Sequence, residues 1–199
     1  MNQIINKGFD RVTDVFKFCS GIEKVPKDKL KEASDRGTAV HDEIQAIQSN
    51  LWIPGLAEHA GYINSYKLWA QEKKFIDNPG RLYDLDLKLT GELDAIYMEA
   101  NTYSLVDFKT TAPKSGAQLK KFKRIWGMQL AAYALLATQT GLKIERLELV
   151  QLDKTGKDPL VHDLSSEAVE NIELYFKCLD VYREFFKGKA PEDDDYSWL

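Results

Sequence analysis

Two aspartates and a lysine form the part of this sequence best suited to chemistry. Asp94 and Asp107 lie in the segment GELDAIYMEANTYSLVDFKTT, and Lys109 follows two residues after the second aspartate. A carboxylate pair with an ammonium group beside it is suited to holding a hard metal ion next to a phosphate. This chemistry requires that the fold bring the three side chains together.

The residues around this trio predict two paired strands. Residues 89–98 and 104–111 are rich in apolar and β-branched side chains, and the dipeptide Ala100-Asn101 between them has turn chemistry. A hairpin centred on that dipeptide makes Asp94 and Asp107 cross-strand neighbours, with Cβ atoms about 4.5–5.5 Å apart. Two like charges in this arrangement destabilise a sheet unless a cation lies between them or one carboxylate holds a proton.

The alternation of side chains along a strand places Lys109 on the same face as Asp107. Val106 and Phe108 then mark a buried opposite face. The alternative is a surface hairpin with a solvated ion pair. A register slip of one residue would take the carboxylate pair apart.

Length and composition are typical of one domain. The chain has 199 residues, of which 44% are hydrophobic. It carries no recognisable signal peptide and no apolar run near the roughly 20 residues that span a bilayer, so we expect a cytoplasmic protein without membrane partners. Cys19 and Cys178 are distant in sequence, which argues against a zinc or iron–sulfur site and a disulfide framework.

Apolar periodicity predicts a mixed central β-sheet flanked by helices, an α/β or α+β class of fold. Helices are expected at residues 9–19 (ended by Gly21), 27–49, 60–75, 117–140 and from a Ser165 or Ser166 cap to 187. Strands are expected at residues 82–87, 89–98, 104–111, 144–152 and 160–163. We interpret residues 1–190 as a single domain of N-terminal helices (1–76), a sheet–helix core (82–164) and a C-terminal helix (165–188), followed by an acidic tail (191–199).

Four further side chains are candidates for the same site. His41 flanks the apolar stripe of the helix at 27–49 and is either a metal ligand or a structural histidine. Glu72 falls on the apolar stripe of the helix at 60–75, where it either joins a cation site or extends its carboxylate from the edge of the stripe. Gln129 and Tyr133 share a face of the helix at 117–140 and either orient a substrate or pack as ordinary boundary residues.

Charge is distributed unevenly although the net charge is only −4. A stretch without acidic residues carries the basic side chains Lys109, Lys114, Lys120, Lys121, Lys123 and Arg124. Cations in the first turns of a helix oppose the helix dipole, so this run is either a phosphate-facing surface or a solvated helix face. The acidic tail, PEDDDYSWL, is expected to be a solvated end or a docking peptide for a partner.

The elements GTAVH, GELD, VDFKT and QLAAY, in this order, resemble the RecB-type branch of the PD-(D/E)XK nuclease superfamily, which includes many phage exonucleases. The matching segments cover residues 37–133, about half of the chain. The resemblance implies a restriction-endonuclease-like core. It implies metal ligands at His41, Asp94, Asp107 and the carbonyl of Phe108, with Glu72 where relatives often carry an acid. It also implies a catalytic Lys109 and a Q-x-x-x-Y element at Gln129 and Tyr133.

The resemblance further implies one or two Mg²⁺ or Mn²⁺ ions that bind the scissile phosphate and activate a water. The cysteines that hold an iron–sulfur cluster in some relatives are missing here. The expected function is a DNA exonuclease that acts on linear ends in phage or bacterial recombination or repair, with little sequence specificity, and a recombination or single-strand-binding protein is a candidate partner. The alternatives are a structure-selective endonuclease and a nuclease-like module that binds DNA or a partner without cutting it.

Overall fold

The computed structural model describes residues 8–51, 53–111, 113 and 115–187. The helices are α2 (Lys17–Ser20), α3 (Lys27–Gln48), α4 (Ala60–Ala70), α5 (Gly116–Ala137) and α6 (Ala168–Phe185), with short 3₁₀ turns at Ile22–Lys24, Ala57–His59, Thr138–Thr140 and Ser165–Glu167. The strands are β1 (Asp10–Arg11), β2 (Lys74–Phe75), β3 (Arg81–Asp84), β4 (Leu89–Glu92), β5 (Ala95–Glu99), β6 (Thr102–Lys109), β7 (Ile144–Gln151) and β8 (Leu160–Asp163).

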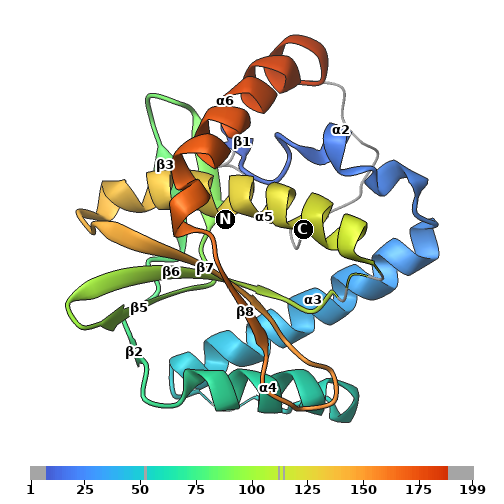
Figure 1. Ribbon diagram of the computed structural model, residues 1–199, viewed down its shortest axis with the longest axis vertical. Coiled ribbons are helices and arrows are strands. Elements are labelled where there is room, and N and C mark those ends of the chain that lie inside the picture. Colours follow the sequence, from blue (N-terminus) through green and yellow to red (C-terminus); the bar gives the residue numbers. More distant parts are fainter. Residues whose placement is uncertain (1–7, 52, 112, 114, 188–199) are drawn as a thin grey trace.

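A five-stranded mixed sheet of order β2-β5-β6-β7-β8 forms the middle layer. Its β6 and β7 are parallel, and its other neighbouring strands are antiparallel. Helices α3 and α4 lie on one side of it, and α5 and α6 lie on the other (Figure 1). The predicted class, a mixed sheet flanked by helices, is confirmed.

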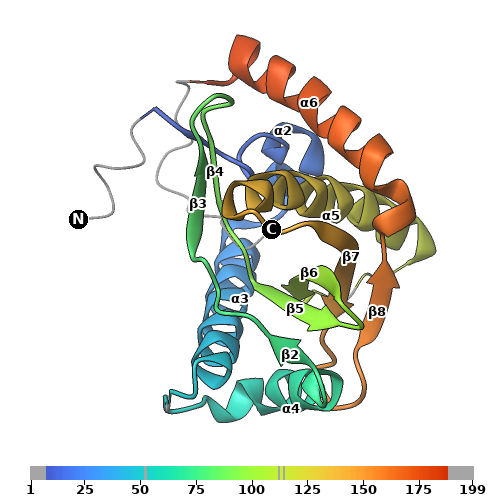
Figure 2. The same ribbon diagram turned by 90° about the vertical axis from the view of Figure 1, so that its left-hand side faces the viewer.

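A second, three-stranded sheet of order β1-β4-β3 stands beside the first (Figure 2). The run of sequence at 89–98 that predicts one strand therefore forms two, β4 and β5, in different sheets. The run divides because its two halves pack in different hydrophobic clusters. Leu89 and Leu93 belong to the cluster beside α5, whereas Ala95 and Tyr97 belong to the cluster beside α4. The chain changes sheets between Leu93 and Ala95, at Asp94.

The β5–β6 hairpin has the predicted register. Its paired residues run from Ala95 opposite Val106 to Glu99 opposite Thr102. The turn is Ala100-Asn101, with φ of 47° and 64°, and two consecutive positive φ values are typical of the tight turns that match strand twist. One step beyond the last pair, the same register brings Asp94 next to Asp107.

Two buried clusters fill the two sides of the five-stranded sheet, and β6 supplies both. Leu105 packs in the cluster with α5 and α6, while Val106 and Phe108 pack in the cluster with α3 and α4. Because side chains alternate along a strand, Asp107 and Lys109 are directed toward α5. The predicted assignment of the two faces is confirmed.

The long helices follow their sequence signals closely. Helix α5 begins after Ser115, whose hydroxyl accepts a hydrogen bond from the backbone N–H of Gln118. The 3₁₀ turn that continues it ends at Gly141, which has the left-handed φ of 78° predicted for a helix stop. Helices α3 and α6 and strands β7 and β8 also lie where the sequence predicts them, within a few residues.

Two expectations for the N-terminal third are wrong. Of the helix expected at 9–19, only Lys17–Ser20 is helical, and it ends at Gly21 as predicted. Residues 10–11 form strand β1 instead, because β1 pairs with β4 and the Asp10 carboxylate is held by Arg183 and Lys187. The helix expected to reach residue 75 ends at Ala70, because Phe75 leaves it to pair with Tyr97 in the sheet. No helix in the described ranges has the length and apolar character needed to cross a membrane.

The contact of β4 with α5 yields a stability prediction. A Cβ atom added at Gly91 would lie 2.6 Å from the Tyr133 ring and 3.1 Å from Leu136, so we expect Gly91→Ala to destabilise the fold by about 1–3 kcal/mol. Urea denaturation would measure it. The matched control is Gly116→Ala in the first turn of α5, where the added methyl meets open space. Equal effects of the two changes would contradict this account of the packing.

Candidate active site

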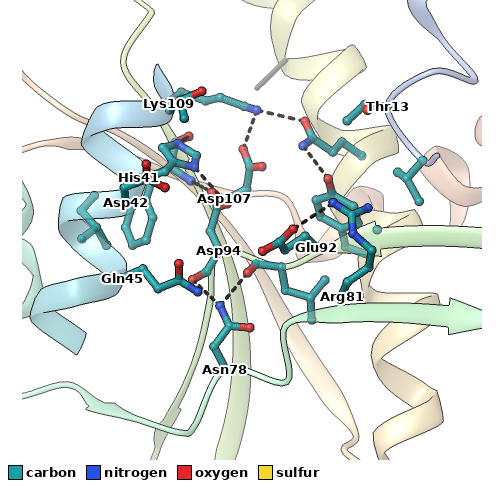
Figure 3. A pocket seen from close by; sticks show the side chains of 18 of the residues that line it. Thr13, His41, Asp42, Gln45, Asn78, Arg81, Glu92, Asp94, Asp107 and Lys109 are labelled. Atoms are coloured by element: carbon teal, nitrogen blue, oxygen red, sulfur yellow. Dashed lines mark hydrogen bonds and ion pairs between the residues drawn. The ribbon is translucent and has the colours of Figure 1, made fainter. Parts of the chain in front are cut away.

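A pocket of about 220 Å³ lies where the two sheets, α3 and α5 meet (Figure 3). Most of the side chains that the sequence singles out line this one pocket, although they come from distant segments. They are His41 from α3, Asp94 from the link between the sheets, Asp107, Phe108 and Lys109 from β6, and Gln129 and Tyr133 from α5.

A buried polar chain runs from β6 to α5. Nζ of Lys109 lies 3.0 Å from Oδ2 of Asp107 and donates a 3.0 Å hydrogen bond to Oε1 of Gln129. Nε2 of Gln129 in turn donates to the Tyr133 hydroxyl at 3.3 Å. The spacing of four residues places Gln129 and Tyr133 one above the other on the helix, so α5 holds the lysine from the side opposite the strand.

Burial has the largest effect on the pKa values of these hydrogen-bonded side chains. The side chains of Lys109 and Asp107 are only 4% and 2% exposed. Burial, together with repulsion from Asp94, raises the pKa of Asp107 to about 6, even though Lys109 opposes the change. Burial likewise raises the pKa of Tyr133 well above its usual value, so its hydroxyl stays protonated.

His41 connects Asp94 to β6. Its Nδ1 lies 3.1 Å from Oδ1 of Asp94, and its Nε2 donates to the carbonyl oxygen of Phe108 at 3.0 Å. Burial works to lower the pKa of His41, but the Asp94 carboxylate outweighs it and the pKa is raised. Burial acts to raise the pKa of Asp94, but His41 and Lys109 reverse this and the pKa is lowered. Oδ2 of Asp94 also accepts a 2.7 Å hydrogen bond from the Phe108 N–H.

These donors fit a divalent cation in their chemistry. Two carboxylates, a backbone carbonyl and an imidazole are ligands that suit Mg²⁺ or Mn²⁺. In the structure His41 Nε2 donates a hydrogen bond to the Phe108 oxygen, so a cation held by both atoms would replace that hydrogen bond. In the described residues no three His, Cys, Asp or Glu side chains converge as a ready-made metal cluster. Asp94 and Asp107 are instead paired with His41 and Lys109.

The pocket also contains residues that the sequence analysis missed. Arg11 and Arg81 bring two guanidinium groups from the smaller sheet, and Arg81 forms a 2.9 Å ion pair with Glu92. Asn78 donates to the backbone carbonyls of Leu93, at 2.8 Å, and Asp94, at 3.3 Å, which fixes the chain where it changes sheets. In the sequence, Asn78 is visible only as part of the loop Asn78-Pro79-Gly80, and the pairing of β1 that brings Arg11 here has no local signal.

Two predicted contributions are not found at the pocket, and two further predictions fall on residues that the structure does not describe. Glu72 is exposed in a turn after α4, with φ of 67°, so its expected position on a buried helix stripe is wrong. Lys120, Lys121, Lys123 and Arg124 line a separate hollow beside α6, and Arg124 is paired with Glu170. Lys114 and the acidic tail at 191–199 lie outside the described residues.

Comparisons with known proteins point to a nuclease family. A family model described as the PD-(D/E)XK nuclease superfamily matches residues 54–196. No curated protein matches the chain. Among solved structures, the alkaline exonuclease LHK-Exo from Laribacter hongkongensis is similar, with a TM-score of 0.40, 12% identity and coverage of 94% of this chain and 95% of the other. The protein SSO0001 is similar with a TM-score of 0.38, 14% identity and coverage of 93% and 88%.

The raised pKa of Asp107 predicts that this carboxylate weakens the fold at neutral pH. An aspartate in an unfolded chain titrates near 3.9, so the protonated form of Asp107 stabilises the fold below about pH 4, and this stabilisation is lost as the pH rises through about 6. We therefore expect Asp107→Asn to raise the free energy of unfolding by about 1–3 kcal/mol at pH 8 in a chelating buffer, and to change it little at pH 4.

Urea denaturation at the two pH values measures this difference. The matched control is Asp35→Asn, because Asp35 is 64% exposed on α3 and its ion pair with Lys31 should contribute at most about 0.5 kcal/mol. If Asp107→Asn were less stable than the unmodified chain at pH 8, the attraction of Lys109 would outweigh burial and the interpretation would fail.

Proposed function

The chain belongs to the PD-(D/E)XK nuclease superfamily, and on that premise we propose that it is a metal-dependent DNA exonuclease of the RecB-type branch, acting in recombination or repair. Members of this superfamily hydrolyse nucleic-acid phosphodiester bonds and generally use divalent metal ions. The proposal concerns the finer points: the substrate, the mode of cutting, the ion and the role of each residue.

The observation that carries the proposal is the buried position of Lys109 between Asp107 and Gln129. A lysine held by two partners, with its side chain 4% exposed, keeps one orientation at the edge of a pocket that also contains Asp94 and His41. Burying an ammonium–carboxylate pair is expensive, and a hydrophobic pair of similar size would usually serve stability as well. A catalytic role accounts for the presence of both charges.

Each residue has a proposed task in the reaction. Asp94, Asp107, His41 and the Phe108 carbonyl would hold a divalent cation, which when bound supplies Lewis-acid chemistry at the scissile phosphate. Lys109 would donate hydrogen bonds to a phosphate oxygen or to the attacking water, and its positive charge would offset the charge that develops in the transition state. Gln129, supported by Tyr133, would keep the ammonium group aimed at the pocket.

Nucleic-acid binding is proposed to use two sets of cations. Arg11 and Arg81 line the pocket itself and are suited to phosphates near the bond that is cut. Lys120, Lys121 and Lys123 lie at the beginning of α5, the helix that also supplies Gln129, so they would contact the backbone at a distance from the reaction. Contacts to the backbone position the nucleic acid without reading its bases, so little sequence preference is expected.

Two substitutions test the catalytic assignment. We expect the unmodified chain to release nucleotides from linear DNA in the presence of Mg²⁺ or Mn²⁺, and Asp107→Ala or Lys109→Ala to lower the rate at least about 100-fold. The matched control is Lys143→Ala, because the side chain of Lys143 is 85% exposed and remote from the pocket. Far-ultraviolet circular dichroism checks that each variant is folded.

The substrates in this assay separate the competing functions. An exonuclease leaves closed circular DNA intact, whereas an endonuclease converts it to linear or nicked forms. If the unmodified chain released nothing from linear or circular DNA with either ion, the protein would be a non-cleaving, nuclease-like module and the proposal would be wrong.

Binding of the ion can be tested without catalysis. A ligand that binds only the folded state stabilises it, by about 2.7 kcal/mol at 100 times its Kd, so Mn²⁺ or Mg²⁺ should raise the Tm of the unmodified chain by several degrees. We expect Asp94→Asn and His41→Ala to remove most of this rise, and Asp35→Asn to retain it. The same rise in all three variants would place the ion elsewhere.

A further inference from the structure

A second hollow, of about 1040 Å³, lies on the α5–α6 side of the molecule. Its walls are the first half of α5, the first half of α6 and Cys19 of α2. Figure 1 shows how α2 and α6 converge on α5 from different ends of the chain. The hollow shares no lining residue with the pocket that contains Asp107.

The chemistry of this hollow is that of an apolar base with a positive rim. Apolar and thiol side chains come from α2, α5 and α6, among them Leu119, Ile125, Met128, Leu174, Cys19 and Cys178. Four basic side chains line it against two acidic ones, Glu167 and Glu170. Glu170 already neutralises Arg124.

The remaining cations of the rim have no such partner. In the described part of the chain, no carboxylate lies within ion-pair distance of Lys120, Lys121 or Lys123. All three stand in the first turns of α5, where the helix dipole already favours an anion. The hollow therefore suits a ligand that carries several negative charges next to an apolar group.

We propose that the occupant of this hollow is the chain's own segment at 191–199, with the sequence PEDDDYSWL. Four consecutive acidic residues, Glu192 to Asp195, match the lysine rim, and Tyr196, Trp198 and Leu199 match the apolar lining. The acidic and apolar groups are adjacent in the segment, as the lysines and the apolar side chains are in the hollow.

The length of the chain permits this contact within one molecule. From Cys178, which lines the hollow, α6 rises about 10 Å to its end at Phe185. The twelve residues after Lys187 can span up to about 40 Å when extended, which is enough to return along the helix. A short connection also gives a high effective concentration, about millimolar, so that even weak contacts would keep the segment in place.

A nucleic-acid strand matches the lining of the hollow less completely than the acidic segment does. A phosphate backbone would use the lysines but would leave the apolar lining without a partner. If Lys120, Lys121 and Lys123 also contact nucleic acid, the acidic segment competes for them and acts as an internal inhibitor. The docking itself does not depend on whether the protein is a nuclease.

Disulfide trapping in the full chain tests the contact, because Cys19 is an exposed native thiol beside the hollow. Ser197→Cys introduces a second thiol into the segment, and Cys178→Ser leaves Cys19 as the sole native one. With diamide as oxidant we expect an intramolecular bond from position 197 to Cys19, identified by peptide mass mapping. Burial raises the pKa of the Cys19 thiol, so the reaction is run near pH 8.5.

Charge variants show whether the proposed contacts drive the trapping. Lys120→Glu with Lys123→Glu, or Asp193→Asn with Asp194→Asn and Asp195→Asn, should slow bond formation at least tenfold. Lys67→Glu with Lys143→Glu, an equal change of charge at exposed positions outside the hollow, should leave the rate unchanged, and Tm values check that each variant is folded.

Three outcomes would overturn the proposal. One is trapping that is equally fast in the charge variants, which would indicate random collision of a tethered thiol. Another is a bond that forms only between two chains, which would make a second copy the occupant. The third is a failure of the segment to be trapped, combined with protection of Cys19 from alkylation by a short single-stranded oligonucleotide. This result would assign the hollow to nucleic acid.

Discussion

The candidate site depends above all on the register of one pair of antiparallel strands. The turn at Ala100-Asn101 sets the pairing of β5 with β6, and this pairing brings Asp94 to the level of Asp107. Because side chains alternate along a strand, a slip of one residue would turn Asp107 toward the opposite core. Val106 and Phe108 are 1% exposed in that core, so their burial opposes the slip. The register is thus held by hydrophobic packing on the face away from the chemistry.

On the other face, a polar network occupies space that apolar side chains could fill. The pair Lys109–Asp107 is almost fully buried, and burial together with the nearby Asp94 raises the pKa of Asp107. A buried ion pair adds little to stability, and its remaining polar atoms need hydrogen-bond partners. Gln129 of α5 provides such a partner by accepting a hydrogen bond from Lys109. The network therefore couples the position of the helix to that of the strand, which gives the lysine a fixed direction.

Helix α5 links this site to the rest of the molecule. Its second half contributes Gln129 and Tyr133 to the pocket, and its first half carries the lysines of the second hollow. The helix packs closely on both sides, because Gly91 of β4 lies under Tyr133 and Gly127 faces the amide of Asn171 in α6. A ligand in either cavity would thus contact the same rigid element.

The sequence alone determined the local parts: the hairpin, the long helices, the face shared by Asp107 and Lys109, and the candidates His41, Gln129 and Tyr133. These follow from periodicity and turn chemistry, which act over a few residues, and the family match covers the segments GELD, VDFKT and QLAAY. Only the tertiary structure decided what depends on distant pairing. It moved Glu72 to a surface turn, divided one predicted strand between two sheets, replaced the beginning of the first predicted helix by β1, and brought Arg11 to the pocket. Contacts between residues far apart in the chain outweigh local propensity there, and no local pattern records them.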